Sequence, residues 1–453
     1  MNVFRKRSQF LLVKALYPKI SFRGLRELLY HEVRERFEEG YDIDIDEFKL
    51  RIDKASSVEE LLSVYGEMVE LEIRDDYGYV EPSDWNGICR ERAGRFTKFG
   101  LRLSTDELRD RILGGWLGRC AGCMLGKPVE GWSRERIRQA LRRAGEYPLR
   151  NAYFPLKAFS DLSARQVASI APLTRGNISR AERDDDLDYT LLNLLVYERC
   201  GDSFTSMDIA DEWLLRLPYH LVYTAERAAY RNLVIGLKPP DTATFLNPYR
   251  EWIGAQIRAD FWGYVSPGDP ERAVEYAFRD ASLSHVKNGI YGELYMAALI
   301  SLAYVCEDPL KLVEEGMKAI PHRSRLAEAL RFVLALYHRG LDWEEAVDEI
   351  LLKLGHYHPV HTINNAAIVV AALLWGEGDY SRTVTYAVLP GLDTDCNGAT
   401  AGSIMGVILG ASRIPREWVD PLGDRLATAL SGLGVQRVSV LAERTLKCVL
   451  RDE

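Results

Sequence analysis

Two aspartates separated by a single residue, Asp393 and Asp395, stand in the turn-forming segment Gly391-Leu-Asp-Thr-Asp-Cys-Asn-Gly398. A helix-length apolar run follows directly over 399–410, so both carboxylates are expected near the positive end of a helix. Carboxylate oxygens gathered in this way are typical ligands of a hard divalent cation. The pair therefore predicts one half of a metal site.

A second acidic cluster contains Asp184, Asp185 and Asp186, with Asp188 one helical turn after Asp184. The cluster precedes an amphipathic helix that is expected to run from Leu187 to a stop at Gly201. Carboxylates this dense repel one another unless a cation neutralises them, whereas an acidic helix cap explains only one or two. We interpret the first three as further ligands of the same metal site.

Glycine recurs at every fourth position in two distant segments, at 398, 402, 406 and 410 and again at 114, 118, 122 and 126. Each of these glycines costs a helix interior about 0.5–1 kcal/mol relative to alanine, so a structural benefit must offset them. Glycines at this spacing make one helix face flat, and we expect the two faces to pack together. That pairing would bring Glu130, just past the Lys127-Pro128 break, next to Asp393 and Asp395.

Two other motifs are interpreted as structural. Cys120 and Cys123 form a C-x-x-C without the second pair or the strand pattern of a zinc or redox site, so they are read as small packing residues. In His356-Tyr-His-Pro-Val-His361 the proline breaks any helix that would align the histidines, which are read as pocket or capping residues.

The whole composition is that of a soluble, folded chain: 453 residues, 47% hydrophobic, with a net charge of −8. No long basic block predicts a nucleic-acid partner, and no apolar run reaches the roughly 18–20 residues of a membrane span. The basic start at 1–14 is interpreted as a helix and not as a signal sequence. Seven scattered cysteines indicate free thiols, so the expected location is cytoplasmic.

Helical periodicity predicts two helical parts, an N-terminal extension over 1–100 and a larger domain over 101–453. In the extension, helices are expected over 21–39 and 57–72, with no chemical motif. In the domain, aromatic, amide and histidine side chains around glycines suit the wall of a small-ligand pocket. The substrate-binding candidates from these segments are Asp260, Tyr264, His285, Asn288 and Gly289.

These motifs, in this order, resemble those of the ADP-ribosylglycohydrolase family, of the dinitrogenase-reductase-activating type, over roughly 105–425. The segment ending at Glu130 looks like the family's Gly-x-x-x-Gly-x-x-x-Glu element, and 184–186 like its Thr-Asp-Asp-Thr motif. The segment 391–395 looks like its Gly-x-Asp-x-Asp-Thr motif, although Cys396 replaces the final threonine. Leu187 replaces the second threonine of the middle motif, and Cys123 occupies a position where the family usually has aspartate.

The resemblance implies an all-α fold in which 101–453 is a compact multi-helix catalytic domain with two Mg²⁺ ions, or Mn²⁺ in their place. It also implies hydrolysis at the anomeric carbon of a ribose by a metal-activated water. The implied catalytic residues are Glu130, Asp185 and Asp395, and the implied metal ligands are Asp184, Asp185, Asp186, Asp393 and Asp395. The expected partner is a small ribosyl or ADP-ribosyl substrate, free or attached to a protein. Two alternatives stay open: a hydrolase of nucleosides or other small ribosyl compounds, and an inactive ADP-ribose-binding protein.

Overall fold

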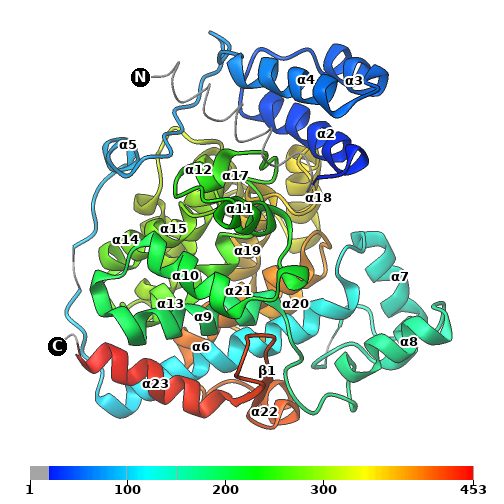
Figure 1. Ribbon diagram of the computed structural model, residues 1–453. Helices are drawn as coiled ribbons and strands as arrows, with labels where there is room; N and C mark the ends of the chain where they lie inside the picture. The colour runs from blue at the N-terminus through cyan, green and yellow to red at the C-terminus, as the bar shows by residue number, and fades with distance from the viewer. Residues whose placement is uncertain (1–19, 98, 150, 452–453) are drawn as a thin grey trace.

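The computed structural model describes residues 20–97, 99–149 and 151–451. The helix expected over 1–14 lies outside the described residues. The described chain is predominantly helical, and its strands form a short antiparallel hairpin of β1 (Arg425–Ala427) and β2 (Val435–Arg437) (Figure 1). The prediction of an all-α fold is confirmed. None of the described helices has the length and apolar character needed to cross a membrane.

Among the described residues, the N-terminal part contains four helices, and the remainder forms the body around one central helix pair. The N-terminal helices are α2 (Phe22–Glu38), α3 (Ile45–Lys54), α4 (Val58–Glu70) and α5 (Trp85–Glu91). Those of the body are α6 (Thr105–Gly126), α7 (Arg134–Ala144), α8 (Ala164–Ile170), α9 (Asp185–Cys200), α10 (Ser206–Arg216), α11 (Thr224–Val234), α12 (Asp241–Thr244), α13 (Ala259–Tyr264), α14 (Pro270–Ala281), α15 (Lys287–Leu302), α16 (Pro309–Gly316), α17 (Arg325–His338), α18 (Trp343–Leu354), α19 (Thr362–Gly376), α20 (Tyr380–Val388), α21 (Thr394–Leu409), α22 (Arg416–Val419) and α23 (Val438–Arg451).

Helices α6 and α21 form the central pair, and they carry the two glycine stripes. The stripes run antiparallel: a Cβ added at Gly118 would overlap the carbonyl oxygen of Gly402, and one at Gly122 would overlap that of Gly398. The reverse additions clash with the opposite backbone in the same way. The predicted packing of the two stripes is therefore confirmed, and the absence of side chains explains why the sequence tolerates so many helical glycines.

Hydrogen bonds hold the pair in register at several levels. The Thr394 hydroxyl donates to the carbonyl of Gly126 at 2.9 Å, which joins the C-terminus of α6 to the N-terminus of α21. The Tyr380 hydroxyl donates to the carbonyl of Gly118 at 3.1 Å from the neighbouring helix α20. The two ends joined by Thr394 are those that carry the predicted chemical residues.

The N-terminal helices α2, α3 and α4 lie together at one end of the body (Figure 1) and bury a hydrophobic cluster of their own, completed by Phe245 and Leu246. Helices α2 and α4 match the expected segments 21–39 and 57–72. Arg250 of the body holds α2 in place, because its guanidinium donates to Glu32 at 2.9 Å and also to Glu39. The placing of a domain boundary near residue 100 stays a prediction.

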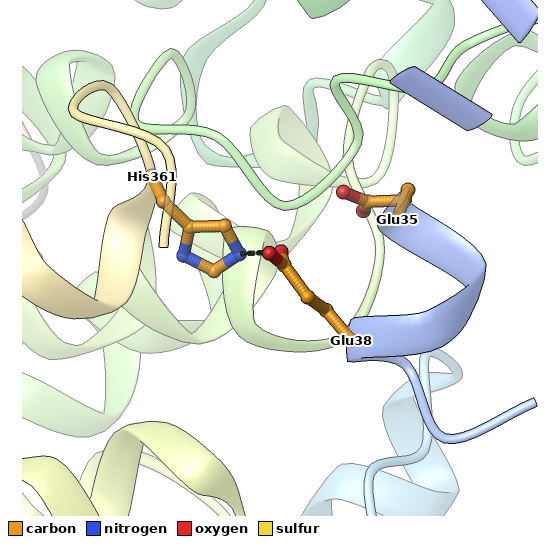
Figure 2. A group of neighbouring side chains, drawn as sticks. All are labelled: Glu35, Glu38 and His361. Atoms are coloured by element: carbon orange, nitrogen blue, oxygen red, sulfur yellow. Dashed lines mark ion pairs between the residues drawn. The ribbon is translucent and has the colours of Figure 1, made fainter. Parts of the chain in front are cut away.

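Helix α2 also meets the start of α19 (Figure 2). His361 Nδ1 accepts the Ile363 backbone N–H at 3.1 Å, which confirms a capping role, and Nε2 faces the Glu38 carboxylate at 3.9 Å. Burial lowers the pKa of His361 well below its ordinary value, so this imidazole is neutral near pH 7. Burial outweighs the Arg34 guanidinium and raises the pKa of Glu38 to about 7.

Candidate metal and active site

The N-termini of α9 and α21 converge, and each begins with an aspartate. Asp184 is the N-cap of α9, and its carboxylate accepts the Asp186 backbone N–H at 3.1 Å. Asp393 is the N-cap of α21, and its own N–H donates to the Asn365 side chain at 3.1 Å. Both positions lie at the positive ends of helix dipoles, where carboxylates are stabilised.

The side chains at these two helix starts form two groups of neighbouring ligand atoms. Cys123, Asp184 and Asp186 make one group, and Asp393, Asp395 and Cys396 make the other; within each, the ligand atoms lie within 4.8 Å of one another. The Cys396 thiol donates to the Asp186 carboxylate at 3.2 Å, so the groups touch. The structure thus brings together the acidic motifs that the sequence separates by some two hundred residues.

Two basic side chains neutralise part of this cluster. Lys127 forms an ion pair with Asp184. Arg119, fully buried in the middle of α6, contacts the Asp186 carboxylate at 3.1 Å and that of Asp260 at 2.7 Å. Burial alone would raise the pKa of Asp184, but the Lys127 ammonium holds it below its ordinary value.

Sequence reasoning did not identify either cation. Arg119 gave one signal, since a charged residue between the glycines of an otherwise apolar helix must be buried against a counter-charge. Lys127 gave none, because its partner is fixed only by the tertiary contact between the end of α6 and the start of α9.

The carboxylates of Asp393 and Asp395 have no such counter-ion among the described residues. Burial raises the pKa of both, and for Asp395 the neighbouring Asp393 and Glu130 raise it further. Asp395 Oδ1 is buried and has no hydrogen-bond partner among the described residues. Unpaired, buried carboxylate oxygens are the donors that a divalent cation takes, so the residues present fit a metal ion.

Asp185 lies half-buried at the first position of α9. Burial and the adjacent Asp184 raise its pKa well above the ordinary value. Asp188 differs from its three neighbours: its carboxylate accepts from the Arg183 guanidinium and from the Ala429 backbone N–H, at 2.8 and 3.1 Å. It therefore fixes the C-terminal segment onto α9.

Glu130 follows the short turn of Lys127–Val129 at the end of α6. The residue is exposed, yet partial burial of its carboxyl group, followed by the charges of Asp393 and Asp184, raises its pKa to about 7. The glycine pairing thus places Glu130 within electrostatic reach of Asp393, as expected from the sequence. A carboxyl group with this pKa exists in both protonation states near neutral pH, which suits a general acid/base.

Two of the substrate-binding candidates, Asp260 and Tyr264, are fully buried on α13, and Asp260 hydrogen-bonds the same Arg119 that contacts Asp186. Asp260 pairs with Arg119, and the Tyr264 hydroxyl hydrogen-bonds the Ser403 hydroxyl at 2.6 Å. These contacts join α13 to both helices of the α6–α21 pair, because Arg119 lies on α6 and Ser403 on α21.

The other three candidates, His285, Asn288 and Gly289, lie where the N-terminal helices meet the body. His285 accepts the Ala255 backbone N–H at 3.3 Å, and the Asn288 side chain donates to Glu251 at 2.8 Å. A Cβ at Gly289 would meet the Arg250 carbonyl. The structure does not bring the five candidates to one place, and their assignment to the substrate stays a prediction.

Comparison with known proteins adds to this geometry. The model of the family described as ADP-ribosylglycohydrolase matches residues 104–449. An uncharacterized protein of Archaeoglobus fulgidus is 25% identical over 338 residues, which cover 72% of this chain and 97% of that protein. A solved structure described as an ADP-ribosylglycohydrolase-related protein complex aligns with 77% of this chain and 100% of its own, at a TM-score of 0.47 and 17% identity.

Proposed function

Because the chain belongs to the ADP-ribosylglycohydrolase family, we propose that it hydrolyses the N- or O-glycosidic bond at the anomeric carbon of an ADP-ribosyl compound, using divalent metal ions. The observation that carries the proposal is the position of Glu130. The exposed Glu130 carboxyl group has a pKa of about 7 and lies within electrostatic reach of Asp393 and Asp395, which are buried and lack a counter-ion among the described residues. A proton-transfer group beside a cation site is the arrangement that this hydrolysis requires.

The aspartates divide into those without a basic counter-ion and those that already have one. Asp393 and Asp395, with Asp185 from α9, would hold the divalent ions, Mg²⁺ or Mn²⁺ by the resemblance of their motifs. Ions bound there would supply Lewis acidity toward ribose hydroxyls and water. Asp184 and Asp186 are part-neutralised by Lys127 and Arg119, and they would orient the cluster as well as coordinate.

Glu130 would transfer the proton. In its carboxylate form it would take a proton from the attacking water, and in its acid form it would protonate the leaving group. Its pKa near 7 allows the exchange between these forms at neutral pH. Because Glu130 is exposed, its carboxyl group would be accessible to a ribosyl substrate, free or attached to a protein.

A screen of purified protein tests the proposal. N- and O-linked ADP-ribosyl compounds and free nucleosides are incubated with the protein and Mg²⁺ or Mn²⁺, and released ADP-ribose or ribose is measured by chromatography. ADP-ribose release supports the proposal. Release from nucleosides alone identifies a hydrolase of small ribosyl compounds, and binding of ADP-ribose without any release identifies an inactive binding protein.

The variant Glu130→Gln tests the role of the carboxyl group, because it keeps the shape and removes the proton-transfer function. Turnover should fall about a hundredfold or more. Glu135→Gln is the matched control, an exposed glutamate on the following helix outside the cluster. Near-normal turnover by Glu130→Gln would exclude Glu130 from the chemistry.

A further inference from the structure

One of the two ligand groups at the candidate site combines a thiol with two carboxylates. Asp393, Asp395 and Cys396 occupy the first turn of α21 and its cap, and all three are buried. Their ligand atoms lie within 4.8 Å of one another. The Cys396 sulfur is therefore as well placed to contact a bound ion as the carboxylate oxygens are.

The group built on Cys123 serves as an internal comparison. It also contains a thiol and two carboxylates, but Lys127 and Arg119 already supply positive charge to Asp184 and Asp186. No described basic side chain forms an ion pair with Asp393 or Asp395 within the same distance limits. A second, independent observation concerns Asp395, which is 5% exposed and whose Oδ1 has no partner among the described residues. The uncompensated negative charge therefore belongs to the group of Asp393, Asp395 and Cys396.

A thiolate changes which ion such a site prefers. Mg²⁺ requires hard oxygen ligands in a near-ideal octahedron and dehydrates reluctantly. Zn²⁺, Co²⁺ and Fe²⁺ accept sulfur together with carboxylate oxygen and bind more tightly than Mn²⁺ to mixed ligand sets. Cys396 therefore shifts the preference away from the ion that carboxylates alone would favour.

We propose that Cys396 is a metal ligand and that Asp393, Asp395 and Cys396 together select a thiophilic divalent ion of the Zn²⁺ and Co²⁺ class over Mg²⁺. The inference rests on the proposed function, in that Asp393 and Asp395 bind a divalent ion, and it replaces the Mg²⁺ or Mn²⁺ that the motifs imply with a thiophilic ion at this one ligand group. When the sulfur–metal bond forms, the thiol releases its proton to solvent, and its hydrogen bond to Asp186 is lost. The oxidation states of sulfur and metal do not change.

Titration of the full-length, metal-stripped protein with Co²⁺ tests this without any enzymatic readout. Ligand-field absorption in the visible reports bound Co²⁺, and sulfur-to-cobalt charge-transfer absorption in the near ultraviolet reports a thiolate ligand. The wild type should show both bands, a stoichiometric addition of Zn²⁺ should remove them, and a large excess of Mg²⁺ should not.

The variants Cys396→Ser and Cys396→Ala should lose the charge-transfer band. Their Co²⁺ affinity should fall by at least the roughly 10–100-fold that loss of an outer partner alone costs. Cys120→Ser and Cys123→Ser should keep the band. Cys120 is a matched control because it is also buried, lies on α6, which packs against α21, and belongs to neither ligand group. Melting of each variant without metal shows that it is folded.

Three results would overturn the proposal. Visible bands without charge transfer would indicate an oxygen-only metal site, leaving the proposed function intact. A charge-transfer band that survives in both Cys396 variants and disappears in Cys123→Ser would assign the sulfur ligand to the other group. Absence of any Co²⁺ band would exclude the thiolate ligand, and the screen with Mg²⁺ or Mn²⁺ would then decide the proposed function by itself.

Discussion

Gly118 on α6 and Gly402 on α21 face each other so closely that a Cβ added to either would overlap the carbonyl oxygen of the other. This contact sets the distance between the two helices at their middle. Glu130 follows the short turn after the end of α6, and Asp393 caps the start of α21, so the separation of Glu130 from the carboxylates depends on this contact. The glycines therefore help to position Glu130 and the aspartates, although they are not among the site residues themselves.

Alanine at either position should separate the helices. Gly118→Ala and Gly402→Ala should each lower the free energy of unfolding by at least the ~1–3 kcal/mol typical of overpacking, because the clash is with backbone and not with a movable side chain. Denaturant titration measures this loss.

Gly24→Ala is the control for the glycine variants. Gly24 is also helical, on α2, but a Cβ there would meet only side-chain atoms at 3.2 Å or more. Alanine should be neutral or stabilising at that position by helix propensity. Equal stability of all three variants would mean that the stripes do not face a tight neighbour.

The glycine pairing was predictable from sequence because both stripes have the same period of four, and two flat helix faces have an obvious complement in each other. The convergence of Asp184 with Asp393 was predictable because both belong to carboxylate clusters too dense to remain without a cation. The ion-pair partners of Arg119 and Lys127 were not predictable, because an ion pair depends on contacts between elements far apart in the chain. The sequence indicates a ligand-facing aromatic at Tyr264, and composition alone does not reveal that its hydroxyl hydrogen-bonds Ser403 on α21.

Arg119 should be among the residues on which stability depends most. Arg119→Met leaves the buried carboxylates of Asp186 and Asp260 without their cation, and it should cost about 3–5 kcal/mol. Adding Asp260→Asn should recover part of the loss, since one uncompensated charge is then gone. Denaturant midpoints of the single and double variants measure both effects.

Arg109→Met provides the comparison on the same helix. Arg109 is 40% exposed and pairs with Glu443 at 2.6 Å, so its loss should cost far less stability than the loss of Arg119, because solvent screens an exposed ion pair. If Arg119→Met and Arg109→Met are equally stable, the buried charge network does not hold α6 to α9 and α13.

The contact between α2 and α19 should make stability depend on pH. The pKa of Glu38 rises from 4.5 to about 7 on folding, so between these values the folded state holds a proton that the unfolded chain has released. The contribution of Glu38 is full below pH 4.5 and is lost as the pH rises toward 7, by at most about 3 kcal/mol.

Glu38→Gln should flatten this part of the profile, because the amide cannot release a proton. Melting temperatures recorded across the same pH range for the wild type and the variant measure the difference. Glu27→Gln, at an exposed position of the same helix, should leave the profile unchanged. A wild-type slope of opposite sign between pH 4.5 and 7, retained in Glu38→Gln, would contradict the assignment.

We propose that carboxylates at the start of α21 hold divalent ions needed for hydrolysis of an ADP-ribosyl bond. The rate of ADP-ribose release by metal-stripped protein, before and after addition of a divalent ion, tests this for the wild type and Asp395→Asn. No release is expected without metal, and addition of the ion should restore release in the wild type but not in the variant. Release at the same rate in the presence of a chelator, or full recovery by Asp395→Asn, would contradict it.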